Sequence, residues 1–158
     1  IVKSNIVKDV LENIERYSAA NNHYVFEITE TIEMDQIPAV QNVFKEFVKN
    51  EFRFAIDDFG TGYSNYGYMR DRTFDIVKVD RSFVTDIDKL KDNYLMVSFI
   101  IKMAHEMGLH VCIEGVETKE ELSCVKKLGA DYIQGYYYGK PVCLQDFEEQ
   151  HLKRFVLG

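Results

Sequence analysis

The sequence lacks the features that mark several large classes of protein. It has no excess of positive charge, because 19 Lys and Arg stand against 26 Asp and Glu and the formal net charge is −7. A protein that binds duplex nucleic acid needs a basic face to displace counterions from phosphates, so we expect no duplex nucleic acid partner. The cysteines Cys112, Cys124 and Cys143 are odd in number and form no C-x-x-C pair. A disulfide framework and a zinc site are therefore not indicated.

Long apolar runs and an apolar leader are also missing. No stretch approaches the length that spans a bilayer, and the first residues have the charge of an amphipathic helix rather than of a signal peptide. We therefore expect a cytoplasmic domain, in a parent protein that upstream segments could still anchor to a membrane. The chain starts at Ile1 without an initiator Met, and we expect it to be a piece of a longer protein.

What the sequence does contain is a regular alternation of apolar patterns. Short runs rich in β-branched and aromatic residues predict five strands, at residues 24–29, 52–56, 75–80, 110–115 and 131–136. Apolar residues at helical spacing predict helices before, between and after them, over about 6–17, 35–48, 95–107, 118–128 and 144–155. Thr118 and Glu121 have the spacing of a capping box, and Gly129 stands where that helix should end.

Strands that are apolar on both faces and separated by helices predict an α/β fold with a parallel sheet. Two arrangements fit, an open doubly wound sheet and a (β/α)8 barrel of the TIM type. No G-x-G-x-x-G follows a predicted strand, which weakens the first. Five strands do not close a barrel, so for the second we expect this chain to supply about the last five β/α units, with roughly three strands missing.

Polar side chains gather at the carboxyl ends of the predicted strands. They are Glu27 and Glu30, Asp57 and Asp58, Lys78 and Asp80, Glu114 and Glu117, and Gln134. Parallel strands bring these ends to one rim, where ligands bind in such folds. Carboxylates gathered there repel one another unless they are protonated or hold cations, and ligands with only oxygen donors favour Mg²⁺ or Mn²⁺.

Structural roles compete with this interpretation. A single acid at a strand end is more often a helix cap or a solvated residue. Asp57 and Asp58 could open a turn, and Lys78 could form a structural ion pair. Glu30 and Glu117 lie further along the chain, where a supporting or capping role is as good an interpretation as metal binding.

Five segments resemble the motifs of one family, the EAL domains that cleave cyclic di-GMP. They are FEITET, IDDFGTGYSN, VKVDRSFV, IEGVE and YIQGYYYGKPV, which resemble in order and spacing the family's E-x-T-E, DDFGTGYS, IKID-x-SFV, AEGVE and QGY-x-x-x-KP segments. Together they extend from about Tyr24 to Val142, which makes the resemblance far more specific than any single short match.

The resemblance implies a site with two metals and a set of residue roles. Glu27 and Asp57 would share one metal, and Asp57, Asp58 and Glu114 would bind the second. Lys78 would contact the attacking water or a phosphate, so that Lys78, Glu114 and Asp57 are the implied catalytic residues. Supporting roles fall to Glu30, Asp80, Glu117 and Gln134, and substrate contacts to Lys78, Gly135 and Pro141.

The family's reaction is hydrolysis of cyclic di-GMP to linear pGpG with Mg²⁺ or Mn²⁺, and Ca²⁺ inhibits it. Two metals about 3.5 to 4 Å apart suit this in-line attack on a phosphodiester. The resemblance also implies a homodimer, whose interface includes the region after DDFGTG, and a sensor or GGDEF domain upstream. Exposed Tyr63, Tyr66 and Tyr68 would be consistent with that interface, and a role in packing the loop fits them equally well.

One departure from the family concerns the metal ligands. The Glu-Ala-Leu motif and an Asn on the following strand supply further metal ligands, and we expect both upstream of Ile1. Residues 1–158 are therefore interpreted as a partial EAL domain that is inactive alone. Two alternatives remain: an inactive EAL domain that acts as a cyclic di-GMP receptor or protein-interaction module, and a barrel metallohydrolase acting on another phosphate ester.

Overall fold

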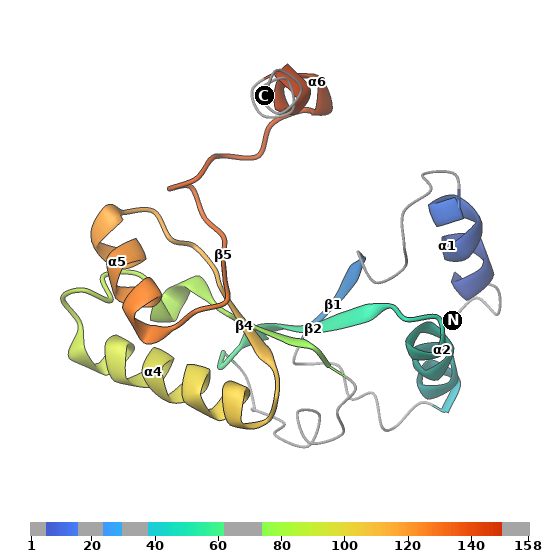
Figure 1. Ribbon diagram of the computed structural model, residues 1–158, viewed down its shortest axis with the longest axis horizontal. Helices are drawn as coiled ribbons and strands as arrows, with labels where there is room; N and C mark the ends of the chain where they lie inside the picture. The colour runs from blue at the N-terminus through green and yellow to red at the C-terminus, as the bar shows by residue number, and fades with distance from the viewer. Residues whose placement is uncertain (1–5, 16–23, 30–37, 62–73, 150–158) are drawn as a thin grey trace.

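A computed structural model describes residues 6–15, 24–29, 38–61 and 74–149, which form one parallel five-stranded sheet with helices between the strands (Figure 1). The strands are β1 (Val25–Thr29), β2 (Arg53–Phe59), β3 (Ile76–Val79), β4 (His110–Ile113) and β5 (Tyr132–Ile133). The helices are α1 (Ile6–Glu15), α2 (Pro38–Lys49), the 3-10 turn η3 (Arg81–Phe83), α4 (Lys91–Glu106), α5 (Lys119–Leu128) and α6 (Leu144–Phe147). The predicted α/β class is confirmed.

The strands lie in the sheet in the order of the sequence, β1-β2-β3-β4-β5, and every pairing is parallel. Crossovers between parallel neighbours share one hand, so a strand order that never reverses places the connecting helices on one face. A doubly wound sheet would reverse its order and carry helices on both faces. Within the described residues the order is therefore that of a barrel wall, and the doubly wound alternative is excluded there.

The main core lies between this sheet and its helices. On β3 and β4, Val77, Val79, Val111 and Ile113 are completely buried. Val97 on α4 and Val125 on α5 are completely buried too, and these two helices contact each other. Every second strand residue thus belongs to the apolar layer under the helices, as the two-residue repeat of a strand requires.

The intervening strand residues line a hollow on the opposite face of the sheet. Its lining includes residues from all five strands or their ends: Val25, Glu27, Arg53, Ala55, Ile76, Lys78, Cys112, Tyr132 and Gln134. In a barrel this face is the interior. The side chains that turn away from the helices therefore include the predicted site residues Glu27, Lys78 and Gln134.

The ends of α5 follow the sequence prediction closely. The Thr118 hydroxyl oxygen accepts a hydrogen bond from the backbone N–H of Glu121, and the Glu121 side chain accepts one in return from the backbone N–H of Thr118. Gly129 ends the helix in the left-handed conformation with φ of 90°. The predicted capping box and glycine terminus are confirmed.

Other elements differ from the predictions at their ends. Strand β5 has only two residues because the chain turns at Gly135, whose backbone packs directly on Val116. The turn η3 was not predicted, since a single 3-10 turn has too few residues for an apolar repeat. Of the predicted closing helix, Leu144 and Phe147 lie in α6, while Leu152 and Phe155 lie outside the described residues. No described helix is both long and apolar enough to cross a membrane.

Candidate metal centre

A bulge in β2 brings two adjacent aspartates to the same site. Ile56 pairs with Val77 and Phe59 pairs with Val79, so β2 contains one more residue than β3 between these two pairs. Asp58 adopts a left-handed conformation with φ of 54°, which Asp tolerates better than most residues. In a regular strand Asp57 and Asp58 would point to opposite faces, whereas the extra residue lets both carboxylates reach the rim.

A lysine lies at the centre of the acidic residues. Lys78 is only 6% exposed on β3, and its Nζ lies 2.8 Å from one carboxylate oxygen each of Glu27, Asp57 and Glu114. These three acids come from β1, from β2 and from the residue that follows β4. Acids from two neighbouring strands and from the end of a third thus converge on the ammonium group of β3, which confirms that the predicted strand ends meet.

The charge on Lys78 is maintained despite its burial. Burial alone would lower the pKa of this ammonium, because removal from water disfavours the charged form. Hydrogen bonds to Asp57, Glu114 and Glu27 outweigh burial and raise the pKa of Lys78 above its usual value. Lys78 is therefore a permanent cation among the carboxylates, and the structural ion pair considered for it is present.

Asp57 and Glu114, together with Asp58, form a cluster of carboxylates that could hold a metal ion. Asp57, Asp58 and Glu114 each offer a carboxylate oxygen, and the three oxygens lie within 4.8 Å of one another. Oxygens bound to one octahedral Mg²⁺ at about 2.1 Å lie about 3 to 4.2 Å from one another, so these three oxygens would move closer together on binding one ion. No other cluster of this kind occurs within the described part of the chain. An all-oxygen donor set of this spacing fits a hard divalent cation.

The remaining predicted residues take varied positions. Asp80 caps η3, since its carboxylate accepts a hydrogen bond from the backbone N–H of Ser82 at 2.9 Å. Glu117 has an exposed side chain in the loop after β4. Gln134 joins Glu27 and Lys78 in lining the hollow on the inner face of the sheet.

The two implied substrate-binding residues lie together beyond β5. Gly135 and Pro141 line one surface hollow, in which Gln134 also takes part. Pro141 follows Lys140, whose ammonium lies 5.3 Å from the ring centre of Tyr136. Glu30, Tyr63, Tyr66 and Tyr68 lie outside the described residues.

Cys112 lies close to the site, but its thiol is not suited to nucleophilic chemistry. It pairs in register with Lys78 and faces the same hollow. Burial, and then the negative charge of Glu114, raise the pKa of Cys112 to about 11. Since the thiolate is the reactive form, this thiol stays neutral and inert at physiological pH.

One residue near the site has a larger role than the sequence suggested. Glu121 was identified only as the second half of a capping box, yet its carboxylate also accepts a hydrogen bond from the backbone N–H of Asp86 in the loop after β3. The capping-box spacing was a signal for the local contact. Nothing in the sequence pattern marks the contact with a residue 35 positions away.

Comparisons with known proteins identify the family to which the chain is similar. The family model described as "EAL domain" matches residues 1–141. The "Probable cyclic di-GMP phosphodiesterase PdeA" of Escherichia coli is 34% identical over 146 residues, which are 92% of this chain and 20% of that protein. The "Cyclic di-GMP phosphodiesterase PdeB" of Shewanella oneidensis is 35% identical over 131 residues, 83% of this chain and 15% of that protein. The chain therefore spans a fifth or less of the length of these relatives.

Solved structures give the same result. The EAL enzyme Bd1971, in a form with cAMP and cyclic-di-GMP bound, superposes with a TM-score of 0.85 at 33% identity, covering 93% of this chain and 39% of that chain. The EAL domain of Mycobacterium smegmatis DcpA has a TM-score of 0.86 at 27% identity, covering 97% of this chain and 68% of that chain. The predicted α/β fold of the TIM-barrel type is confirmed by these matches. The acidic rim, the strand order and the matched motifs have one common explanation: the chain belongs to the EAL domain family.

Proposed function

We propose that the protein is a metal-dependent phosphodiesterase that hydrolyses cyclic di-GMP to linear pGpG. The observation that carries the proposal is the convergence of Asp57, Asp58 and Glu114 beside Lys78 at one rim of the sheet. Relatives of 34% and 35% identity are named as cyclic di-GMP phosphodiesterases, which supports this substrate. A similar EAL structure is described with cyclic-di-GMP bound.

The roles of the rim residues follow from their chemistry. Asp57, Asp58 and Glu114, together with Glu27, which also contacts Lys78, would hold Mg²⁺ or Mn²⁺, because hard divalent cations prefer carboxylate oxygens. Divalent cations held there would activate a nucleophile and offset negative charge on the phosphoryl group, and Ca²⁺ in their place would inhibit.

The ammonium of Lys78 would offset further negative charge as the phosphodiester is attacked. The substrate side of the site would be lined by Gln134, Gly135 and Pro141, since these residues line hollows that begin at the same rim. Asp80, Glu117 and Glu30 are proposed as supporting residues outside the metal shell.

The partners and location of the protein belong to the same proposal. A homodimer is supported by α4, where Leu95, Met96 and Phe99 are 55%, 46% and 58% exposed. The much greater length of the relatives supports a parent protein with a sensor or GGDEF domain upstream. The free thiols of Cys112, Cys124 and Cys143 suit a cytoplasmic site of action.

The experiment is an assay of the full-length protein with cyclic di-GMP, in parallel samples with Mg²⁺, Mn²⁺, Ca²⁺ or EDTA, with the products separated by chromatography. We expect pGpG with the first two ions only. Binding of cyclic di-GMP without turnover under all four conditions would instead support the receptor alternative. Hydrolysis of other phosphate esters but not of cyclic di-GMP would contradict both.

A further inference from the structure

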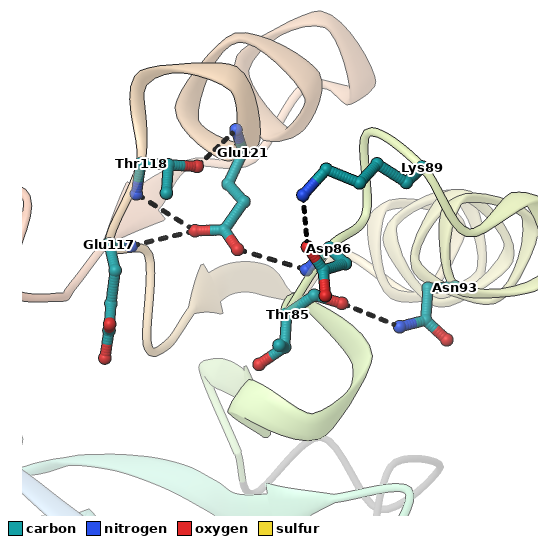
Figure 2. A network of polar contacts seen from close by, with 7 residues as sticks. All are labelled: Thr85, Asp86, Lys89, Asn93, Glu117, Thr118 and Glu121. Atoms are coloured by element: carbon teal, nitrogen blue, oxygen red, sulfur yellow. Dashed lines mark hydrogen bonds and ion pairs between the residues drawn. The ribbon is translucent and has the colours of Figure 1, made fainter.

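The buried carboxylate of Glu121 joins two loops of the rim (Figure 2). Glu121 is 6% exposed, and besides Lys78 it is the one buried charged residue in the described ranges. Its Oε2 accepts hydrogen bonds from the backbone N–H groups of Glu117 at 2.9 Å and Thr118 at 3.0 Å, and its Oε1 accepts one from Asp86 at 3.1 Å. A capping box accounts for the bond from Thr118 alone. The other two bonds extend the contact beyond helix α5.

The donors of these bonds come from the connections after two neighbouring strands. Asp86 belongs to the connection that follows β3, the strand of Lys78, and Glu117 belongs to the connection that follows β4, three residues after Glu114. Burial by itself would raise the pKa of Glu121, but the N–H groups of Glu117, Thr118 and Asp86 outweigh it and lower that pKa. The carboxylate is therefore held as an anion that both loops share.

The loop on the Asp86 side is itself firmly held. Asp86 has a φ of 56°, and its carboxylate pairs with Lys89 at 2.6 Å. The side-chain amide of Asn93, on α4, donates to the backbone carbonyl of Thr85 at 3.1 Å (Figure 2). Glu121 is thus attached to a loop that has further contacts of its own, one of them with α4.

The loop on the Glu114 side is held at several points, of which the bond to Glu121 is one. Gly115 packs so closely on Arg81 that a Cβ would collide with its side chain. Val116 is completely buried and its N–H donates to the carbonyl of Gln134 at 3.2 Å. Glu121 fixes the end of this segment at Glu117, three residues after the carboxylate that lies 2.8 Å from Lys78.

We propose that Glu121 is a positioning residue of the metal centre: it locks the loop after β4 to the loop after β3 and so holds Glu114 in its place for binding a divalent cation. The inference rests on the proposed function, because it assigns Glu114 to the metal site. The hydrogen bonds of Glu121 involve the backbone of Asp86, Glu117 and Thr118 and not a proposed metal ligand, so that it acts through the backbone of the two loops. Residues outside the ligand shell that orient ligands in this way typically contribute 10- to 100-fold to metal affinity or activity.

The test is Glu121→Gln in the full-length protein. A glutamine has the same shape, and its one amide oxygen can keep the bonds from Glu117 and Thr118, but its NH₂ group then faces the N–H of Asp86, where no acceptor remains. The matched control is Glu120→Gln, the same change at an exposed position in the same turn of α5. A second control, Thr118→Val, removes the hydroxyl that caps α5 and leaves the Glu121 carboxylate in place.

Three measurements decide the matter: hydrogen exchange of the Asp86 amide, the dissociation constant of Mn²⁺ by calorimetry, and kcat with cyclic di-GMP at limiting and saturating Mn²⁺. For Glu121→Gln we expect at least about tenfold faster exchange and about 10- to 100-fold weaker Mn²⁺ binding. The loss of kcat should be large at limiting Mn²⁺ and largely restored at saturation. Both controls should bind Mn²⁺ within about twofold of wild type, although Thr118→Val lowers the melting temperature.

Two results would overturn the inference. Glu121→Gln could bind Mn²⁺ as tightly as Glu120→Gln, or Thr118→Val could weaken Mn²⁺ binding as much as Glu121→Gln, which would reduce Glu121 to a helix cap. If the proposed phosphodiesterase function were wrong, the result would differ from both of these. In that case the wild type binds Mn²⁺ without hydrolysing cyclic di-GMP, and the Mn²⁺ affinities of the three variants still decide the role of Glu121.

Discussion

Replacing Lys78 with Met tests whether the lysine and a bound metal ion stabilise the same group of carboxylates in the folded protein. The variant keeps the length of the side chain and removes the ammonium that lies 2.8 Å from Glu27, Asp57 and Glu114. Without metal, three carboxylates then face one another with no cation between them. We expect the full-length protein to be less stable in EDTA, because like charges at short distance repel and their desolvation is no longer offset.

The size of the loss follows from the exposure of the partners. Removing one member of a fully buried ion pair costs about 3–5 kcal/mol. Here the side chains of Glu27, Asp57 and Glu114 are 51%, 21% and 19% exposed, so water screens part of the repulsion. We therefore expect a loss of about 2 kcal/mol, since exposed pairs contribute at most about 1 kcal/mol and these acids are intermediate. For a domain of this size that is a fall in Tm of about 4–8 °C.

The assay is thermal unfolding in EDTA and again with saturating Mn²⁺. The ion should raise the Tm of Lys78→Met by more than it raises that of wild type, because it takes over the position of the missing charge and stabilises the folded state by binding to it. Lys102→Met, at an exposed position of α4, is the control for the same substitution. If Lys78→Met melted in EDTA like Lys102→Met and gained no more from Mn²⁺ than wild type, the acids would not depend on this cation and the reasoning would be wrong.

Further outcomes are expected at other positions. Gly135→Ala should lower the Tm by several degrees while Gly139→Ala changes it little, because a Cβ at Gly135 would collide with backbone atoms and one at Gly139 meets nothing within 4 Å; circular dichroism melts would show it. Asp57→Asn should lower kcat more than about 100-fold, beyond the loss typical of residues outside a ligand shell, and should shrink the rise in Tm caused by Mn²⁺. Burial alone would raise the pKa of Asp131, but hydrogen bonds from His105 and the backbone outweigh burial and lower that pKa below its ordinary 3.8. Its contribution to stability should therefore be complete above about pH 4 and be lost as the pH falls through the folded pKa. Denaturant titrations of wild type and Asp131→Asn should accordingly converge below pH 4, and a gap that widened there would contradict the assignment.

The sequence predicted the features that depend on neighbours in the chain. Thr118, Glu121 and Gly129 lie within one helix and its ends, so their spacing alone was enough. The strand ends could also be predicted, since apolar runs end where Asp57 and Glu114 begin. Parallel strands then require those ends to meet at one rim.

The features that the sequence did not predict depend on contacts across the fold. The left-handed Asp58 and the bulge of β2 exist only in relation to the register of β3, which no local pattern encodes. The bond from Asp86 to Glu121 joins residues 35 positions apart. Strand β5 is short because Gly135 packs on Val116, a contact between neighbouring loops. Long-range backbone packing, rather than residue preference, decided each of these.

The bulge of β2 also limits how the Asp57–Asp58 pair could be moved to another protein. If the two residues were grafted onto a flat strand, the second carboxylate would turn to the side where Ile56 and Phe59 are now buried. An ionised group in such a layer has no counter-charge, and it would either take up a proton or push the helices away. A designer who copies this centre must therefore transfer the extra residue of β2 and its left-handed backbone together with the carboxylates, because the backbone geometry is as much a part of the centre as the oxygens.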